Sequence, residues 1–222
     1  MIALRNVYFD YPGGITALSD VSYTIMEGAT VVVGPNGSGK TTLLKVAGLL
    51  YKPSRGSISV DSVEFWTQPS DVRVRIRRNI VYVHDNPVMV TGSVAENIAY
   101  GLILRGVGRS EALEEAYRFL ADLKLEWLAS RNSKNLSSGE AQLVSLIRAL
   151  ILKPKCLLLD EPTSNLDPDR RRIFVKLIED YDGVLVVATN DYSLASRIAD
   201  RIVVMKGGRI VSTDGVELLA DM

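Results

Sequence analysis

The sequence predicts an α/β fold with a parallel central sheet, antiparallel strands on its amino-terminal side and an inserted block of helices. Residues 2–33 alternate apolar and polar side chains, a pattern typical of short, partly antiparallel strands. Continuous apolar runs at 156–159 and 184–188 are typical of strands buried in the middle of a parallel sheet. From about residue 94 to residue 152, apolar residues recur at helical spacing, which predicts the helical block.

Turn signals delimit the elements of the first half. Signals at 12–14 and 27–28 separate the first strands, and the apolar run 29–33 predicts a buried strand. A glycine-rich loop comes next, and the run 43–47 predicts a helix after it. A turn is expected at 53–56. Further strands are expected at 57–60 and 80–83.

The helical block has its own boundaries. The segment 106–110 separates the first two helices, and we expect Ser110 to cap the second because serine is a favoured N-cap. A loop at 132–135 leads into a third helix. Beyond the block, a helix is expected from about Pro168, and the runs 202–205 and 210–211 predict a hairpin.

Composition is that of an ordinary globular protein. The 222 residues suit one large domain or one domain with a subdomain, and 47% are apolar and 23% charged. The net charge is zero, so a strongly basic nucleic-acid binder is not expected. The single cysteine, Cys156, excludes an internal disulfide and a cysteine-rich metal site. No run of about 18 apolar residues occurs and the amino terminus lacks a signal-peptide pattern, so we expect a cytoplasmic chain that can still dock on a membrane protein.

The strongest functional signal is the glycine-rich loop 34–42, which fits the phosphate-binding pattern G-x-x-x-x-G-K-[ST]. It lies between a predicted strand and a predicted helix, the context that the motif needs. Its backbone N–H groups are expected to surround phosphate oxygens, with added positive potential from the helix N-terminus. Lys40 is expected to reach the β- and γ-phosphates, and Thr41 to bind Mg²⁺. The predicted ligand-contacting residues are Asn36, Gly37, Ser38, Gly39, Lys40, Thr41 and Thr42.

A second signal is the acidic end of the apolar strand at 156–159. Asp160 is placed to hold Mg²⁺, usually through water, and Glu161 to orient or deprotonate an attacking water. A strand that merely ends in an acidic turn has the same local sequence. The pairing with the glycine-rich loop favours the catalytic interpretation.

A third signal is the pentapeptide 136–140, Leu-Ser-Ser-Gly-Glu, at the start of a predicted helix. Ser137 supplies a hydroxyl, Gly139 leaves its backbone amide unobstructed, and a helix N-terminus attracts anions. For this segment taken alone, a plain helix cap is the alternative.

With these motifs in this order, the chain resembles the nucleotide-binding subunit of an ATP-binding cassette (ABC) protein over nearly its whole length. The pentapeptide 136–140 is similar to the L-S-G-G-Q signature of that family, with Ser138 and Glu140 as departures. The resemblance implies a P-loop NTPase core with a parallel central sheet, an N-terminal antiparallel β-subdomain and an inserted helical subdomain.

The resemblance also implies how the chain is divided. It predicts a single ABC ATPase domain at 1–222. The nucleotide-binding core with the β-subdomain is expected at about 1–87 and 153–222. The helical subdomain with the signature is expected at about 88–152.

ATP, Mg²⁺ and a head-to-tail dimer are implied as well. Each ATP is then held between the glycine-rich loop of one subunit and Ser137, Gly139 and Glu140 of the other. Tyr11 is similar to the aromatic residue that stacks on adenine, and 164–167 to the loop that crosses the dimer interface. The expected partners are a second copy or another ABC subunit, and membrane-spanning permease subunits on separate chains, with no nucleic acid. The expected location is the cytoplasmic face of the cell membrane, as a peripheral subunit.

Two positions depart from the family pattern. The run 80–85 is similar to a strand that the family follows with Gln, and Asp85 takes that place; a shift by one residue puts His84 there instead. An ionised Asp only accepts hydrogen bonds, so Asp85 is expected to bind Mg²⁺ but not to donate to the attacking water. Asn190 replaces a His and keeps a donor with a shorter reach. The departures predict slow hydrolysis, with tolerated sequence drift as the alternative. The predicted catalytic residues are Glu161, Lys40, Asn190 and Asp85, and the predicted Mg²⁺ ligands are Thr41, Asp85 and Asp160.

The resemblance favours the ATPase subunit of an ABC transporter, and the segment 93–102 is similar to importer subunits. The apolar stretch 87–90 is expected to be a groove for a helix of the membrane subunit, with an ordinary core turn as the alternative. The basic run 73–78 is interpreted as a solvated face, and a patch for a partner or acidic lipid heads is the alternative. A soluble ABC scaffold, for example for iron–sulfur assembly, and a low-activity nucleotide switch paired with an active subunit both stay open.

Overall fold

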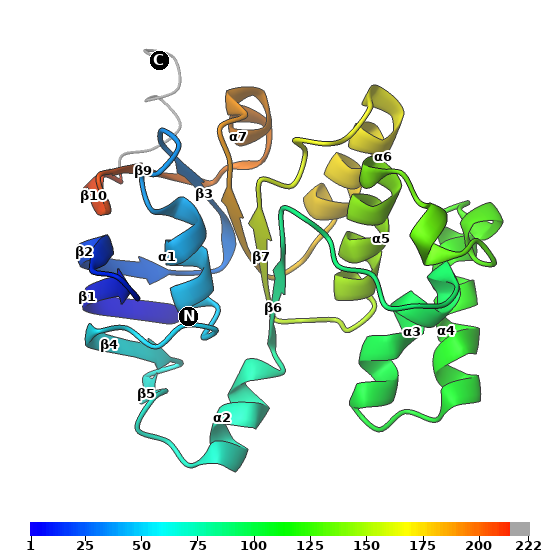
Figure 1. Cartoon of the computed structure of the whole chain (residues 1–222), viewed down its shortest axis with the longest axis horizontal. Coiled ribbons are helices and arrows are strands. Elements are labelled where there is room, and N and C mark those ends of the chain that lie inside the picture. Colours follow the sequence, from blue (N-terminus) through cyan, green and yellow to red (C-terminus); the bar gives the residue numbers. More distant parts are fainter. Residues whose placement is uncertain (214–222) are drawn as a thin grey trace.

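The computed structural model describes residues 1–213, and the rest of the predicted core, 214–222, lies outside the described part. An antiparallel sheet lies at one side, a mainly parallel sheet in the middle and a group of helices at the other side (Figure 1). This arrangement confirms the predicted α/β fold class.

The antiparallel sheet has the strand order β2-β1-β4-β5. Its strands are β1 (Ile2–Tyr11), β2 (Ile15–Ile25), β4 (Arg55–Val60) and β5 (Val63–Glu64). Ile2 and Leu4 are buried on one face of β1, as the apolar alternation requires, and a register shift between Leu4 and Val7 brings Val7 into the same buried cluster. The turn predicted at 53–56 is wrong in its second half, because Arg55 already pairs with Tyr8 of β1 and belongs to β4.

The central sheet has the order β10-β9-β3-β8-β7-β6, in which only the pairing of β10 with β9 is antiparallel. Every residue of β7 and β8 is buried, which explains their continuous apolar sequence. The hairpin predicted near the end of the described chain is present as β9 and β10. The strands are β3 (Gly28–Val33), β6 (Ile80–Val83), β7 (Cys156–Asp160), β8 (Val184–Ala188), β9 (Arg201–Lys206) and β10 (Arg209–Ser212).

Helices α1 (Lys40–Ala47) and α5 (Ser138–Leu150) cover opposite faces of the central sheet. Leu44 of α1 packs in one apolar cluster with Leu158, between the two sheets. Helix α5 packs in the other cluster with Leu157 and Leu159. Because successive side chains of a strand point to opposite faces, this alternation along β7 places the two helices on different sides.

The helical block contains α3 (Val94–Leu104) and α4 (Arg109–Asp122) beside α5. Helix α3 begins with a capping box, in which Ser93 Oγ accepts from Glu96 N (3.2 Å) and Glu96 Oε2 accepts from Ser93 N (2.9 Å). The predicted cap at Ser110 is wrong. Helix α4 begins at Arg109, before the predicted cap. Its N-cap is Gly108, whose carbonyl oxygen accepts a hydrogen bond from Ala112 N (2.9 Å).

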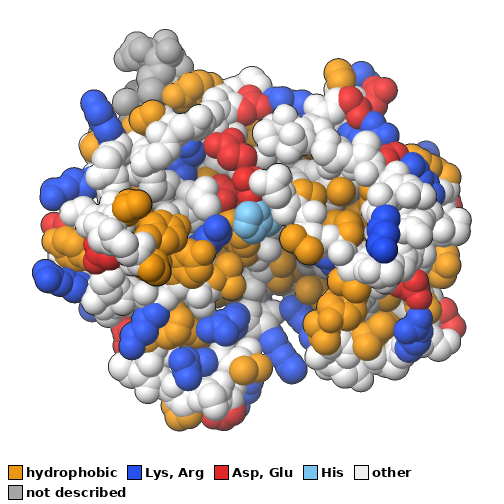
Figure 2. Space-filling model, in the orientation of Figure 1, with side chains coloured by type: hydrophobic (Ala, Val, Ile, Leu, Met, Phe, Trp, Pro, Cys, Tyr) orange, Lys and Arg blue, Asp and Glu red, His pale blue; other side chains and the backbone are white. Residues whose placement is uncertain are grey.

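Two helices were not predicted, α2 (Ser70–Arg77) and α7 (Tyr192–Ile198). Helix α2 buries none of its residues, so it has no apolar stripe for a sequence pattern to detect. Lys and Arg side chains cover much of the lower lobe that contains it (Figure 2). Helix α6 (Pro168–Glu179) begins at the predicted proline. Among the described helices, none combines the length and apolar character needed to cross a bilayer.

Candidate functional site

Three loops meet at one edge of the central sheet, because β3, β8 and β7 are parallel neighbours and end on the same side. The glycine-rich loop follows β3, Glu161 follows β7 and Asn190 lies just beyond β8. Lys40 Nζ is 3.0 Å from Asn190 Oδ1 and 3.7 Å from Glu161 Oε1, so the three loops are in direct contact. Acidic side chains gather near the middle of the face shown in Figure 2. Sheets of this type bind ligands at the carboxyl ends of their strands.

The glycine-rich loop is held by its own backbone. Ser38 N donates to Pro35 O (3.1 Å), and Gly208 N, between β9 and β10, donates to Ser38 O (2.9 Å). Gly39 is the N-cap of α1 with a φ of 101°, and a Cβ there would lie 2.6 Å from Ala17 O, so the position requires glycine. Ser38 Oγ is buried and has no hydrogen-bond partner within the described chain. An oxygen atom of a bound anion would satisfy it.

Lys40 lies inside this loop, with its side chain 7% exposed. Its Nζ donates to Gly34 O (2.7 Å), Pro35 O (3.4 Å) and Asn190 Oδ1 (3.0 Å). These acceptors are neutral amide oxygens. A phosphate oxygen is a stronger acceptor because it is charged, so the ammonium is available to a bound phosphate.

Asp160 is 1% exposed, and its carboxylate accepts hydrogen bonds from two hydroxyls. Thr41 Oγ1 donates to Oδ1 (3.0 Å), and Tyr82 OH donates to Oδ2 (2.8 Å). Sequence reasoning missed Tyr82; its polar tip in an otherwise apolar strand was the available signal. Burial and the nearby Asp160 carboxylate raise the pKa of Tyr82 far above its ordinary value, so the phenol stays protonated and donates.

Glu161 has an unusual backbone, with a φ of 41° in the left-handed region. Its N–H donates to Ala188 O (2.8 Å), which fixes the bend after β7. Its Oε2 accepts from Asn190 N (3.2 Å). Asn190 Nδ2 in turn donates to Asn36 Oδ1 (2.6 Å), so Asn190 contacts the glycine-rich loop, Lys40 and Glu161 at once.

Asp85 interacts within its own turn. Its carboxylate contacts His84 Nδ1 and accepts from Asn86 Nδ2 (3.1 Å). In the part of the chain that the structure describes, no hydrogen bond joins it to Thr41 or Asp160. Its role as a Mg²⁺ ligand therefore stays a prediction.

Tyr11 lies at the end of β1, beside α1. Its hydroxyl is 3.0 Å from Thr42 Oγ1, and its ring meets Phe9 and Tyr51 edge-on. Phe9 and Tyr51 are themselves stacked, with ring centroids 5.2 Å apart. The ring is thus held next to the glycine-rich loop, and its stacking on adenine stays a prediction.

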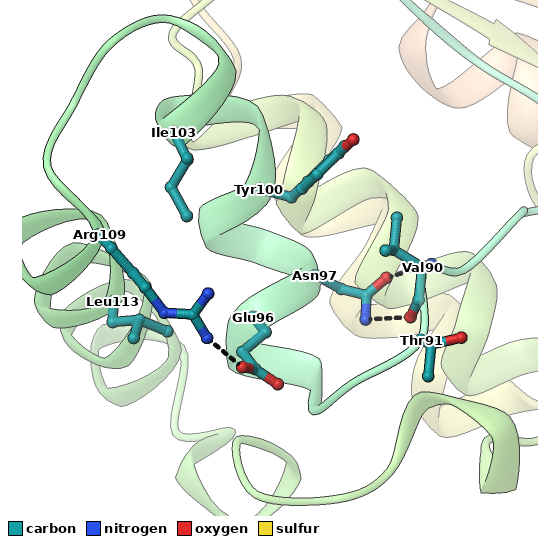
Figure 3. A pocket seen from close by; sticks show the side chains of 8 residues that line it. All are labelled: Val90, Thr91, Glu96, Asn97, Tyr100, Ile103, Arg109 and Leu113. Carbon is teal, nitrogen blue, oxygen red and sulfur yellow. Dashed lines mark hydrogen bonds and ion pairs between the residues drawn. The ribbon is translucent and has the colours of Figure 1, made fainter.

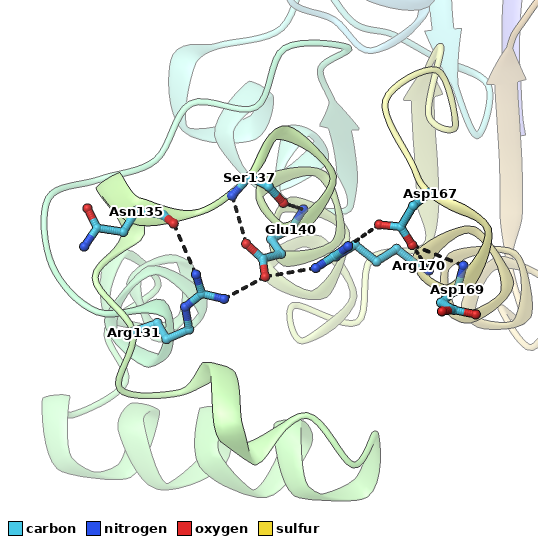
Figure 4. Close-up of polar contacts among 7 residues, drawn as sticks. All are labelled: Arg131, Asn135, Ser137, Glu140, Asp167, Asp169 and Arg170. Carbon is cyan, nitrogen blue, oxygen red and sulfur yellow. Dashed lines mark hydrogen bonds and ion pairs between the residues drawn. The ribbon is translucent and has the colours of Figure 1, made fainter.

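The segment 136–140 forms the N-terminus of α5 (Figure 4). Ser137 Oγ accepts from Glu140 N (3.2 Å), and Glu140 Oε2 accepts from Ser137 N (2.8 Å). Glu140 Oε1 accepts from Arg131 (2.6 Å) and Arg170 (3.0 Å). Burial alone would raise the pKa of Glu140, but these hydrogen bonds outweigh it and lower the pKa below its ordinary range. The carboxylate faces its own chain here, and the nucleotide contact of Glu140 stays a prediction.

The same network reaches the loop 164–167. Arg170 also pairs with Asp167, the N-cap of α6 (Figure 4). A Cβ on Gly139 would lie 3.0 Å from Asn165 O, so the glycine of the signature packs directly against this loop. The signature and the loop 164–167 therefore form one packed unit.

Comparison with known proteins agrees with this geometry. The family model described as ABC transporter matches residues 18–164. The tungstate uptake system ATP-binding protein TupC of Peptoclostridium acidaminophilum is 35% identical over 219 residues, which cover 96% of this chain and 98% of that protein. The lipoprotein-releasing system ATP-binding protein LolD of Hyphomonas neptunium is 35% identical over 218 residues, which cover 95% of this chain and 95% of that protein.

Solved structures show the same likeness. The ATP-binding cassette MJ0796, in a dimeric post-hydrolysis state bound to ADP and Pi, matches with a TM-score of 0.86 and 29% identity. The match covers 97% of this chain and 99% of that chain. Fold, motif order and sequence identity agree, and the chain therefore belongs to the ABC transporter family of ATP-binding proteins.

Proposed function

We propose that this chain is the ATP-binding and ATP-hydrolysing subunit that powers an ABC transporter, an importer, through ATP-driven dimer closure. The meeting of Lys40, Asp160, Glu161 and Asn190 at one sheet edge is the main support, together with the unpartnered hydroxyl of Ser38. These groups supply a cation, a metal-binding carboxylate, a base and hydrogen-bond donors within one site.

Each group has a separate task in this proposal. The glycine-rich loop and Lys40 bind the phosphates of ATP, and Glu161 accepts a proton from the attacking water. Thr41 and Asp160 present only oxygen atoms, which suits Mg²⁺. When bound, the ion neutralises charge on the phosphate oxygens. Because Thr41 gives its hydroxyl hydrogen to Asp160, its lone pairs stay available to the metal.

We propose that hydrolysis is slow. Asn190 uses its amide on Lys40 and Asn36, and only its backbone N–H reaches Glu161. One of the two N–H donors of this amide is therefore already engaged when the γ-phosphate binds. Losing one preorganised donor costs about 10²–10³ in rate. Asp85 adds a carboxylate, which when ionised cannot donate to the water.

A second subunit completes the proposed site. Helix α1 and helix α5 lie on opposite faces of the central sheet, so the glycine-rich loop and the signature of one chain are separated by that sheet. We infer that ATP bridges the loop of one subunit and Ser137 and Gly139 of another, either a second copy or another ABC subunit. No nucleic acid takes part.

Gel filtration of Glu161→Gln tests this dimer. With Mg-ATP the variant is expected to elute as a dimer, because the nucleotide that holds the subunits together is not cleaved. The matched control is Glu161→Gln combined with Lys40→Ala, which is expected to stay monomeric. A monomer from the single variant, with ATP shown to be bound, contradicts the proposed closure.

A groove in the helical block suits a permease subunit on a separate chain. It has a volume of about 210 Å³ and lies between α3, α4 and the loop at 90–91. Val90, Tyr100 and Ile103 give it apolar walls, and Glu96 pairs with Arg109 at 2.6 Å on its rim (Figure 3). We propose that a helix of the membrane subunit docks here and holds the chain at the cytoplasmic face of the membrane. We propose import because the segment 93–102 is similar to importer subunits.

Copurification at native expression separates this reading from its rivals. A multispanning membrane protein is expected to copurify, and Tyr100→Asp is expected to release it because a charge enters the apolar groove. Glu111→Lys changes charge on the exposed start of α4 and is the control. Soluble partners alone favour a scaffold role. If all ATPase turnover comes from a copurifying homologous subunit, this chain is a nucleotide switch. The hydrogen bonds of Asn190 also support that role.

A further inference from the structure

Both carboxylate oxygens of Asp160 are fixed by hydroxyl groups from neighbouring elements. Thr41 Oγ1 donates from the start of α1 (3.0 Å), and Tyr82 OH donates from β6 (2.8 Å). Thr41 belongs to the glycine-rich loop motif, whereas Tyr82 lies in β6, the strand that precedes Asp85.

The sheet register explains how Tyr82 reaches Asp160. Strand β6 pairs with β7 in parallel, with Tyr82 opposite Leu158. Side chains of residues i and i+2 share one face of a strand, so Leu158 and Asp160 lie on the same face as Tyr82. The phenol ring packs in the apolar cluster under α1, and its hydroxyl extends along the sheet to Asp160 Oδ2.

The contact has a direct consequence for the orientation of the carboxylate. One hydrogen bond leaves a carboxylate free to rotate about its Cβ–Cγ bond, whereas hydrogen bonds to both of its oxygens restrict that rotation. Each oxygen keeps a further lone pair, because a carboxylate accepts about four hydrogen bonds. The buried carboxylate is thus held in one orientation with acceptor capacity to spare.

We propose that Tyr82 is a positioning residue for the metal: its hydroxyl orients Asp160 and thereby strengthens the binding of Mg²⁺ together with the nucleotide. The inference rests on the proposed ATP site. Tyr82 does not contact nucleotide or metal in this scheme. Partners that orient a metal-binding side chain are typically worth about 10–100-fold in metal affinity.

Tyr82→Phe removes the hydroxyl and keeps the ring. The affinity for the nonhydrolysable analogue AMP-PNP is measured by calorimetry with MgCl₂ and with EDTA. The ratio of the two dissociation constants reports the metal contribution alone. We expect the ratio to fall by about tenfold in Tyr82→Phe, with affinity in EDTA unchanged. A role in structure alone would lower both affinities together.

Tyr181→Phe is the matched control. Tyr181 is also partly buried against the central sheet, and its hydroxyl donates to Pro154 O (2.7 Å). Its Mg²⁺ ratio is expected to equal that of the parent. Titration of both variants with Mn²⁺ in the presence of AMP-PNP, followed by electron paramagnetic resonance, is expected to show weaker metal binding in Tyr82→Phe alone.

The outcomes separate this inference from the proposed function. A parent protein whose AMP-PNP affinity does not depend on Mg²⁺ overturns the proposed site and the inference with it. A parent with the Mg²⁺ effect and a Tyr82→Phe variant with the same ratio overturns the inference alone. Equal losses in MgCl₂ and EDTA also overturn it.

Discussion

Glu140 stabilises the start of α5 through its charge, and replacing that charge is expected to weaken the fold. Its side chain is 7% exposed, and Oε1 accepts from Arg131 at 2.6 Å and Arg170 at 3.0 Å. Glu140→Gln keeps the shape but removes the charge, and its single amide oxygen can accept at the cap or from the two arginines but not at both places. The variant therefore removes the charge of the network together with one of its two acceptor oxygens.

The expected loss of stability in Glu140→Gln depends on how exposed the two arginine partners are. Hydrogen bonds to charged groups contribute about 1.5–3 kcal/mol when well buried. Arg131 and Arg170 are 35% and 31% exposed, so solvent screens each pair substantially. We expect Glu140→Gln to lower the free energy of unfolding by about 1–2 kcal/mol at pH 7, measured by urea denaturation. Glu115→Gln is the control, since its partner Arg118 is 67% exposed and the change there should stay below about 0.5 kcal/mol.

The pH dependence gives the refuting result. The folded-state pKa of Glu140 is lowered from its ordinary value of 4.5, so its stabilising contribution is complete above about that pH. The contribution is lost as pH falls through the lowered pKa, because the folded state must then bind a proton. The stability difference between parent and Glu140→Gln should shrink as pH falls below 4.5. A difference that is absent at pH 7, or that grows in acid, refutes this account of the network.

Three further changes test the nucleotide site. Lys40→Ala is expected to weaken ATP binding by about 10–100-fold in calorimetry, because a charge-assisted phosphate contact is lost; unchanged affinity contradicts the role of the loop. Asn190→His and Asp85→Gln are expected to raise the ATPase rate, the former by about 10²-fold, and a rate no higher than that of the parent in both argues for tolerated drift. Gly39→Ala is expected to lower the free energy of unfolding by about 1–3 kcal/mol in urea denaturation, since the new Cβ meets Ala17 O at 2.6 Å with φ at 101°.

The parts that sequence predicted well are those with a local signature. Strands β7 and β8 are apolar throughout because both faces are covered, and this alone distinguishes them from the alternating strands of the antiparallel sheet. Lys40 and Thr41 were candidates because the glycine-rich motif fixes residue type and spacing together, and Asp160 because it ends a buried strand; their roles stay predictions. These residues lie close together because the parallel strands that precede them end at the same edge of the sheet.

The parts that sequence missed depend on contacts across space. Tyr82 and Asp160 are far apart in the chain, and only the pairing of β6 with β7 brings them together. Helix α2 buries no residue and gives no apolar period. The Ser110 cap failed because glycine and serine both suit an N-cap, and local chemistry does not choose between neighbouring candidates.

Asn190 shows why a substitution at a known motif position has to be judged from its contacts. Its Oδ1 accepts from Lys40, its Nδ2 donates to Asn36, and its backbone N–H donates to Glu161. A residue with these three bonds links the glycine-rich loop, the phosphate-binding ammonium and the proposed base before any nucleotide arrives. A bound γ-phosphate has to draw Lys40 away from Asn190 or share it. We therefore attribute the expected slow turnover to the Asn190 amide, one of whose two N–H donors Asn36 already engages.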